Sequence, residues 1–211
     1  QMNQVFEDKN GSGATVTVKE AAADQEQFYI LVEFAAPEGT VLPEPDQVEE
    51  GFNRAVLWGG PDGRGIGFGA YRDESCTSFI GSSEAGYAID YVEDSDPTDN
   101  KMEFIIRGHI DPMPKDAAYC LFSGIQSLCM QYQGEWVTML DGMDIDLIVP
   151  LVGMGTHYDF QGRCGVNLNG VTLAVAENLT ISPISVSMDL VIPDGAAYDA
   201  AFGQDGPWQM Y

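Results

Sequence analysis

Basic residues are scarce in this sequence of 211 residues. Nine lysines and arginines stand against 33 aspartates and glutamates, a formal net charge of -24 at pH 7. Nucleic-acid binding relies on clustered Lys and Arg that displace counterions from phosphates, so this balance excludes a nucleic-acid partner. Repulsion from anionic lipids likewise disfavours docking on a bilayer. The simplest interpretation is that acidic charge keeps an exposed domain soluble and monomeric.

Long apolar runs are also absent. The longest, residues 145–154, is interrupted by Asp146 and Pro150, whereas a membrane-spanning helix needs roughly 20 apolar residues. We therefore expect no direct bilayer insertion by this segment. No signal peptide is recognisable, and the opening Gln1 is typical of a trimmed or mature end, so we expect any membrane anchor to lie in a missing N-terminal segment.

Zinc-binding spacings are missing as well. No pair of cysteines forms C-x-x-C, and the two histidines fit no zinc-finger pattern. An even number of cysteines in an acidic, strand-rich chain instead predicts one or two disulfides and an oxidising compartment. We favour a bond between Cys120 and Cys129, because a Ser123-Gly124 turn signal lies between two strand-like runs; four buried free thiols are the alternative. The four cysteines are Cys76, Cys120, Cys129 and Cys164.

Helical periodicity is lacking, whereas strand patterns recur along the chain. No window of about eleven or more residues carries a convincing apolar stripe at helical spacing. Residues 14–20 alternate polar and apolar side chains and residues 28–34 are rich in aromatic and β-branched side chains, so together they predict a β-hairpin. Further predicted strands follow at the short spacing of a sandwich: 55–58, 66–71, 87–92, 102–107, 119–122, 128–132, 136–140 and 144–149.

A glycine-rich break at residues 153–156 predicts a domain boundary. Beyond it, residues 170–176 and 184–192 predict two more strands, connected around residues 179–183. Their pattern is similar to that of the first predicted hairpin, and each of the two is followed by a Pro-acidic-Gly sequence, at residues 37–39 and 193–195. The predicted domains are an Ig-like β-sandwich at 1–153 and a second part at 154–211, which is either an incomplete β domain or a set of strands that completes the first sandwich.

Two patches of this pattern are similar to a known family. Residues 13–20 (Gly-Ala-Thr-Val-Thr-Val-Lys-Glu), followed by Asp24 and residues 28–33, form the first patch, and residues 170–175 with 181–186 form the second. They resemble an uncharacterised family of extracytoplasmic Ig-like domains of Gram-positive bacteria. The resemblance implies the ectodomain of a protein that looks like an anti-sigma factor, behind one membrane-spanning helix. It supplies no catalytic residues, and neither that helix nor a sigma-binding region is recognisable in the 211 residues.

Residues that would carry catalysis occur singly. His109 and Asp111 lie two residues apart after a predicted strand, where such side chains more often share a surface than act as an acid–base pair. His157 is equally isolated, and Ser123 lacks the Gly-x-Ser-x-Gly elbow. The glycine-rich residues 63–69 lack the following helix of a dinucleotide site, so close strand packing is the better interpretation. We predict no enzyme and no bound cofactor.

Acidic loops are the candidates for a metal. Residues 93–100 hold Asp94, Asp96 and Asp99, and calcium binds several oxygen ligands from one flexible loop. The spacing does not match an EF-hand, since counting from Asp94 places Asp99 where that loop needs Gly. Residues 141–146 form a poorer second candidate. A solvated turn is the interpretation we prefer, so no metal ligand is assigned.

Three tryptophans raise the question of sugar binding, which needs exposed, coplanar rings near polar groups. Trp58 and Trp136 lie in apolar strands and are predicted to be core residues of the sandwich. Trp208 follows a Gly-Pro pair near the terminus and is the one we expect to be exposed.

The sequence thus predicts an all-β, Ig-like antiparallel sandwich on the outer side of a bacterial membrane. We expect a non-enzymatic sensing or interaction ectodomain of an anti-sigma-like membrane protein, with a protein or a glycan as its ligand. The second hypothesis is a secreted or lipid-anchored binding module for carbohydrate or a cell-surface partner.

Overall fold

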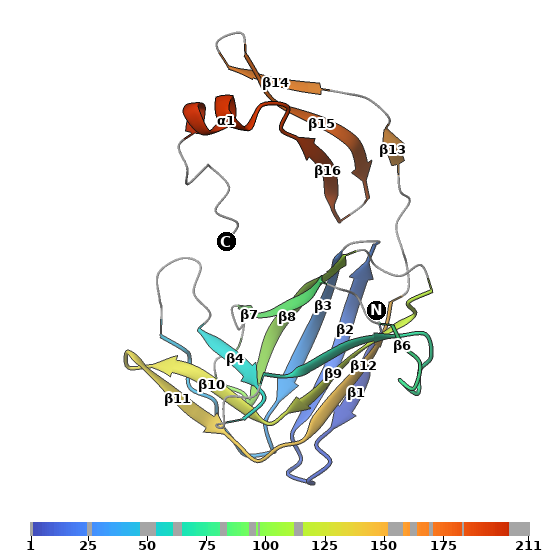
Figure 1. Cartoon of the computed structure of the whole chain (residues 1–211). Helices are drawn as coiled ribbons and strands as arrows, with labels where there is room; N and C mark the ends of the chain where they lie inside the picture. The colour runs from blue at the N-terminus through green and yellow to red at the C-terminus, as the bar shows by residue number, and fades with distance from the viewer. Residues whose placement is uncertain are drawn as a thin grey trace. The chain divides into compact units, whose positions relative to one another are not determined.

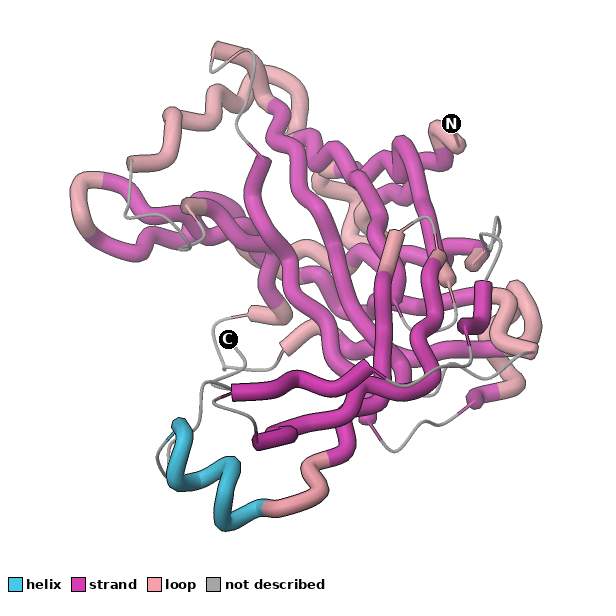
Figure 2. The backbone as a smooth tube through the Cα atoms, turned by 90° about the horizontal axis from the view of Figure 1, so that it is seen from above, coloured by secondary structure: helices cyan, strands magenta, loops and turns pink. Residues whose placement is uncertain are grey.

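The computed structural model of the chain consists almost wholly of antiparallel strands (Figure 1; Figure 2). The chain divides into two compact units, Gln1–Met154 and Gly155–Tyr211, which we call the N-terminal unit and the C-terminal unit. The residues that the structure describes are 2–24, 27–46, 54–60, 65–80, 84–92, 96, 98–111, 116–151, 158–160, 164–168, 171–182 and 184–202.

One layer of the N-terminal unit is a five-stranded sheet with the order β1-β2-β3-β8-β7. The predicted hairpin of β2 and β3 is confirmed, with Val16 opposite Phe34 and Val18 opposite Val32. Successive side chains of a strand point to opposite faces, and these residues all point inward and are buried. The strands are β1 (Gln4–Glu7), β2 (Thr15–Ala23), β3 (Gln27–Ala35), β8 (Lys101–Asp111) and β7 (Glu84–Val92).

Two smaller sheets form the opposite layer. The first has the order β12-β9-β5-β6, and the second has the order β11-β10-β4. The strands of the first are β12 (Ile145–Pro150), β9 (Tyr119–Ile125), β5 (Gly67–Tyr71) and β6 (Phe79–Ile80); those of the second are β11 (Glu135–Leu140), β10 (Ser127–Tyr132) and β4 (Ala55–Trp58).

A single hydrophobic core lies between the layers. It takes Phe28 and Phe104 from the five-stranded sheet, Phe122 from β9, Leu57 from β4 and Met130 from β10. The ring centroids of Phe28 and Phe122 are 5.9 Å apart in an edge-to-face arrangement, a geometry that aromatic pairs favour. This shared core makes the N-terminal unit a β-sandwich, and the predicted all-β fold class is confirmed.

The predicted pairing of residues 119–122 with residues 128–132 is wrong. β9 pairs with β12 and β5, whereas β10 pairs with β11 and β4, so the two runs belong to different sheets. The predicted turn residue Gly124 lies inside β9 with a φ of 75°, where the register with β12 shifts. Its N–H donates to Asp146 Oδ1 over 2.9 Å. This glycine therefore marks a β-bulge and not a hairpin turn.

The predicted disulfide between Cys120 and Cys129 is also wrong, because all four cysteines are free. Cys120 is buried on β9, and Cys129 lies on β10 in the other sheet. Burial raises the pKa of the Cys120 thiol to about 12, so this thiol stays protonated and unreactive. Of the other cysteines, Cys164 is exposed. Disulfide bonding therefore lends no support to an extracytoplasmic location.

In its described residues, the C-terminal unit is a four-stranded sheet accompanied by one helix. Its central strand, β15 (Val171–Ile181), pairs with β13 (Tyr158–Phe160), β14 (Cys164–Leu168) and β16 (Val186–Val191). The predicted connection around residues 179–183 begins later than expected, since β15 runs on to Ile181. The turn after it is closed by the Ser182 N–H, which donates to the Ser185 carbonyl over 2.9 Å.

A short helix, α1 (Gly195–Phe202), follows β16 and packs against β15. Sequence periodicity did not reveal it, because its eight residues are too few to show a stripe. Asp194 caps the helix, since its Oδ1 accepts the Ala197 N–H over 3.1 Å. Tyr198 of the helix is buried, as are Leu173 and Ala174 of β15. Within the described part of the chain, no helix is both long and apolar enough to cross a membrane.

Candidate binding face

Two tryptophans predicted to be core residues are exposed instead. Trp58, at the end of β4, is 40% exposed, and Trp136, on β11, is 56% exposed. The sheet β11-β10-β4 turns alternate side chains toward the core, where Leu57, Leu128 and Met130 are buried. The tryptophans occupy the intervening positions, so they lie on the face away from the core. Trp208 lies outside the described residues.

The strand register places both tryptophans on the same face. Trp58 lies opposite Ser127 of β10, and Trp136 lies opposite Gln131 of the same strand. Residues directly opposite each other in an antiparallel pair point to the same side, and Ser127 and Gln131 are an even number of residues apart. We call this surface the tryptophan face; its residues are Arg54, Val56, Trp58, Cys129, Gln131, Trp136 and Thr138, whereas Ser127 points the same way but is only 1% exposed.

The hairpin that carries Trp136 is held in place at its tip. Gln133 and Gly134 connect β10 to β11 with φ values of 54° and 80°, the positive values of a type I′ turn. The Asp46 N–H donates to the Gln131 carbonyl over 2.8 Å, and the Asp46 carboxylate accepts the Gly134 N–H. The backbone and the side chain of Asp46, a residue from a distant segment, thus hold the hairpin that carries Trp136.

A pocket opens beside Trp58. It has a volume of about 640 Å³ and is formed by β4, β7 and the segment that leads into β5. Trp58, Phe68 and Tyr87 are the aromatic residues of the lining, and a Cβ added at Gly65 would lie 3.8 Å from the Tyr87 hydroxyl, so the missing side chain of Gly65 widens the pocket. The lining is therefore mostly apolar, with one exposed ring at the rim.

Tyr87 fixes one wall of the pocket. Its hydroxyl donates to the Ile66 carbonyl over 2.5 Å, and its ring stands edge-on to Phe122 at a centroid distance of 5.5 Å. Burial raises the pKa of Tyr87, so the hydroxyl stays protonated at neutral pH. A wall held in this way is preformed, which suits ligand binding better than proton transfer.

The glycine-rich stretch contributes to both packing and the pocket. A Cβ added at Gly67 would lie 2.5 Å from Ser123 Oγ, and one added at Gly69 would lie 2.9 Å from the Tyr71 ring. Close strand packing, the interpretation made from the sequence, is confirmed for these two residues. Gly65 lines the pocket instead. No signal in the sequence separated Gly65 from its neighbours, because the pocket depends on strands from three parts of the chain.

The described candidates for catalysis lie apart. His109 is exposed on β8 in the five-stranded sheet, opposite Gly86 of β7. Ser123 belongs to β9 in the opposite layer. The side chain of Asp111 lies outside what the structure describes, and so does the whole of His157.

Only part of the first acidic loop is described. Asp94 lies outside the described residues. The carboxylate of Asp96 accepts the N–H and the hydroxyl of Thr98 over 3.2 and 2.6 Å, and these bonds lower the pKa of Asp96. Asp99 accepts the Lys101 N–H over 2.7 Å. Across the described ranges, no group of three or more His, Cys, Asp or Glu residues could hold a metal ion.

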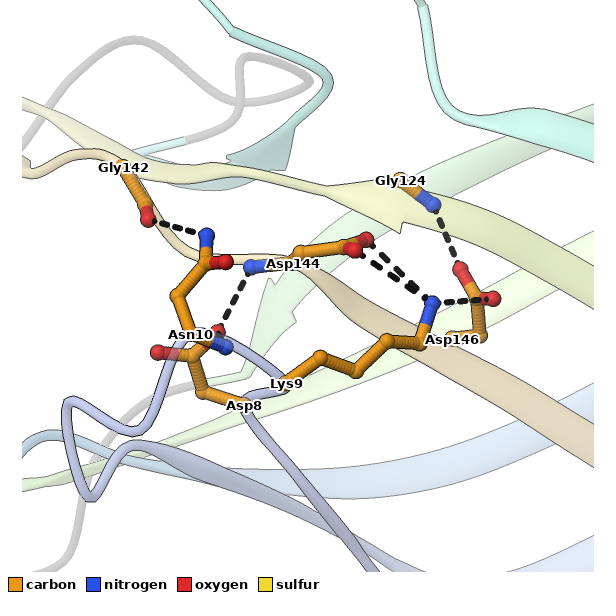
Figure 3. A network of polar contacts seen from close by, with 7 residues as sticks. All are labelled: Asp8, Lys9, Asn10, Gly124, Gly142, Asp144 and Asp146. Carbon is orange, nitrogen blue, oxygen red and sulfur yellow. Dashed lines mark hydrogen bonds and ion pairs between the residues drawn. The ribbon is translucent and has the colours of Figure 1, made fainter.

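The second acidic loop is paired with a lysine. Lys9 Nζ lies 2.6 Å from Asp146 Oδ2 and 3.4 Å from Asp144 Oδ1 (Figure 3). The hydrogen bond to Asp146 raises the pKa of Lys9, which stays charged. Asp146 also accepts the Gly124 N–H described above. These contacts tie the β1–β2 connection to β12 and to the bulge in β9.

Asp8 organises the same network from the other side. Asp8 is only 6% exposed, and its carboxylate accepts the N–H groups of Asn10, Ser12 and Asp144 over 3.0, 3.0 and 2.7 Å. Burial alone would raise the pKa of Asp8, but the hydrogen bonds hold it far below its ordinary value of 3.8. We call the contacts of Asp8 and Lys9 with residues 144–146 the acidic latch; its role is structural.

Comparisons with known proteins bear on the fold alone. No known family matches the sequence, and no curated protein is significantly similar to it. A solved structure described as "The crystal structure of the conserved domain protein from Bacillus anthracis" aligns with 94% of this chain, with a TM-score of 0.59 and 12% identity. The chain spans 57% of the length of that structure.

Proposed function

We propose that this chain is a non-enzymatic binding module whose ligand contacts Trp58 and the pocket beside it. The observation that carries the proposal is a preformed pocket of about 640 Å³ with an exposed tryptophan at its rim. Ligand sites are typically concave, mostly apolar and roughly 300–1,000 Å³ in volume. Trp58, Phe68 and Tyr87 offer large contact areas at little cost in side-chain entropy, because aromatic side chains have few rotatable bonds.

The proposed setting is the outer side of a bacterial membrane. The support is the resemblance of two patches, residues 13–20 with Asp24 and 28–33, and residues 170–175 with 181–186, to extracytoplasmic Ig-like domains of anti-sigma-like proteins. In that setting the module senses or binds a protein or a glycan as the ectodomain of a membrane-anchored regulator. The net charge of -24 suits an exposed, hydrated domain. A secreted or lipid-anchored module for carbohydrate is the second candidate, and the exposed ring of Trp136 favours it.

Amide chemical-shift mapping with a panel of saccharide and aromatic fragments tests the pocket. We expect shifts that concentrate in β4, β7 and the start of β5, and about tenfold weaker binding in Trp58→Ala, because the rim ring is lost. Phe79→Ala is the matched control, since Phe79 is an exposed aromatic residue of β6 that does not line the pocket. The proposal is contradicted if the fragments do not change the chemical shifts of these amides, or if they bind Trp58→Ala as tightly as the unaltered chain.

The absence of catalysis is a separate part of the proposal. Chromogenic ester and glycoside substrates should be turned over no faster by the protein than by buffer, and His109→Ala should behave like the unaltered chain. Turnover that disappears in His109→Ala would identify an active site and overturn this part.

A further inference from the structure

The tryptophan face carries two separate aromatic platforms. Trp58 and Trp136 lie on the two outer strands of the sheet β11-β10-β4, opposite Ser127 and Gln131 of the central strand. Four residues of rise along a strand cover about 14 Å, and two strand spacings cover about 10 Å, so the Cα atoms of the tryptophans are about 17 Å apart. A ligand that contacts both rings must therefore be extended.

The surface between the rings carries little charge: the register places Cys129 midway between them, with Val56 and Thr138 on either side. Thr138 offers an accessible hydroxyl group there, and Gln131 offers an amide beside Trp136. Arg54, beside Gln131, is the one charged residue among the described members of this face. Amide, hydroxyl and guanidinium groups hydrogen-bond readily to the hydroxyl groups of sugars. Aromatic rings, in turn, pack against the apolar faces of sugar rings.

The net charge of the chain limits which polymers can bind to the tryptophan face. A net charge of -24 repels anionic chains, whether nucleic acids or acidic polysaccharides, over distances of roughly a Debye length. The single Arg54 on this face is not enough to reverse that field. An extended ligand for the tryptophan face should therefore be uncharged.

The separation of the rings also argues against a folded protein as the ligand. Residues that dominate protein–protein interfaces cluster near the centre of a well-packed, desolvated patch. Here Trp58 and Trp136 lie at opposite corners, with the small side chains of Val56, Cys129 and Thr138 between them. That arrangement fits a flexible chain of repeating units, each of which contributes one small, similar contact.

We propose that the tryptophan face binds a neutral polysaccharide, with one sugar ring of the chain stacked at the pocket on Trp58 and a more distant one stacked on Trp136. Thr138 hydrogen-bonds to the sugars between them, and Gln131 and Arg54, which lie level with Trp136, hydrogen-bond to the sugar stacked there. This inference rests on the proposed function of the Trp58 pocket and extends it to a ligand class and a second contact.

Affinity electrophoresis of the whole chain in gels that contain soluble polysaccharides tests the proposal. The probes are hydroxyethyl cellulose, arabinoxylan, galactomannan and glycogen, with alginate as the anionic control. We expect retardation by at least one neutral polymer and none by alginate. Trp58→Ala and Trp136→Ala should each weaken binding about tenfold, whereas Phe79→Ala should leave it unchanged.

Chain length provides a second, independent measurement. Isothermal titration with oligosaccharides of increasing length, from the polymer that gives retardation, should show affinity rising until the oligosaccharide reaches both rings. In Trp136→Ala the affinity should stop rising at a shorter length, and Trp136→Phe should recover part of the gain because it keeps an aromatic surface. Circular dichroism and thermal melting of each variant establish that it is folded.

Three outcomes overturn the inference. They are no retardation by any neutral polymer, retardation that both alanine variants keep, and loss of binding in Trp58→Ala with full binding in Trp136→Ala. If fragments still shift the amides around Trp58 in any of these cases, the proposed function stands and only the polysaccharide is excluded. If neither polysaccharides nor fragments bind, both proposals fail together.

Discussion

The two units bury apolar side chains to very different extents. Within the described residues, the N-terminal unit has a continuous core in which Phe28, Phe34, Phe104 and Phe122 are fully buried. The buried hydrophobic residues described in the C-terminal unit are Leu173, Ala174 and Tyr198. That unit also exposes the large apolar side chains of β16 and of the residue that follows it: Val186, Met188, Leu190, Val191 and Ile192.

The difference follows from how each sheet is covered. In the N-terminal unit, both layers turn their apolar faces inward and cover each other. In the C-terminal unit, one helix of eight residues packs against β15. Secondary structure becomes stable by burying one face against another element, so we expect the C-terminal unit to open more readily than the N-terminal unit.

The largest expected effect comes from the core of the N-terminal unit. Phe122→Ala removes a buried ring that contacts Phe28 and Tyr87 and should lower the stability of this unit by about 3–5 kcal/mol. Leu173→Ala, the matched change in the C-terminal unit, should cost about 2 kcal/mol or less, because a thinly covered site can collapse around the gap. Hydrogen exchange resolved by segment measures both. Equal loss of protection in both units from either change would show that they unfold as one body.

The acidic latch provides the next comparison. Asp8→Ala should cost about 3 kcal/mol, because three backbone N–H groups lose a charged acceptor. Asp194→Ala, which removes the cap of α1, should cost about 1 kcal/mol. Denaturant unfolding followed by hydrogen exchange in each unit gives both values. If Asp8→Ala lowers the free energy of unfolding no more than Asp194→Ala does, the acidic latch adds little to the stability of the N-terminal unit.

The latch also predicts a pH dependence. The pKa of Asp8 is lower in the folded chain than its ordinary value of 3.8, so its stabilising effect is complete above that value. As the pH falls below 3.8 toward the folded pKa, the unfolded chain takes up the proton first and this stability is lost. The decline in unfolding free energy between pH 4 and pH 2 should be smaller in Asp8→Asn than in the unaltered chain. Parallel curves would contradict the assignment.

The smallest expected effect comes from the exposed strand. Leu190→Thr keeps a residue suited to a strand and removes an apolar side chain that is 42% exposed, so stability should change by no more than about 0.5 kcal/mol. Thermal melting of the whole chain measures it. A loss of more than about 1.5 kcal/mol would show that β16 is covered in the whole chain, and the contrast between the units would shrink accordingly.

Alternation and β-branched content located the strands well. The hairpin of β2 and β3 is predicted because polar and apolar residues alternate at 14–20 and strand-forming residues follow at 28–34; the observed register pairs residues 15–23 with residues 28–35. Local pattern is sufficient there because the two strands are neighbours in the sequence. Other pairings are different: β9 and β10 are also neighbours, yet β9 pairs with β12 and β5 whereas β10 pairs with β11 and β4, and Gly124 bends β9 instead of reversing the chain.

The candidate site could not be predicted from the sequence for a related reason. Trp58 and Trp136 lie among apolar residues, which indicated burial. Their exposure depends on which of two faces each residue occupies, and a shift of one residue in the register would reverse it. The pocket brings Trp58, Gly65 and Tyr87 together from three strands or strand ends. No residue spacing along the chain indicates that these three residues line the same pocket.

The central ladder of the five-stranded sheet has a kinetic consequence. β3 pairs with β8 from Gln27 opposite His109 to Ala35 opposite Lys101. The hydrogen bonds between these strands cannot form until residues 101–109 have been synthesised. A hairpin such as β2–β3 forms in about 1–10 μs, whereas folds dominated by distant strand pairs take milliseconds to seconds. During that delay β3 presents an unpaired hydrogen-bonding edge, to which another chain can add a strand. The nascent protein is therefore open to strand addition at this edge between the synthesis of β3 and the synthesis of β8.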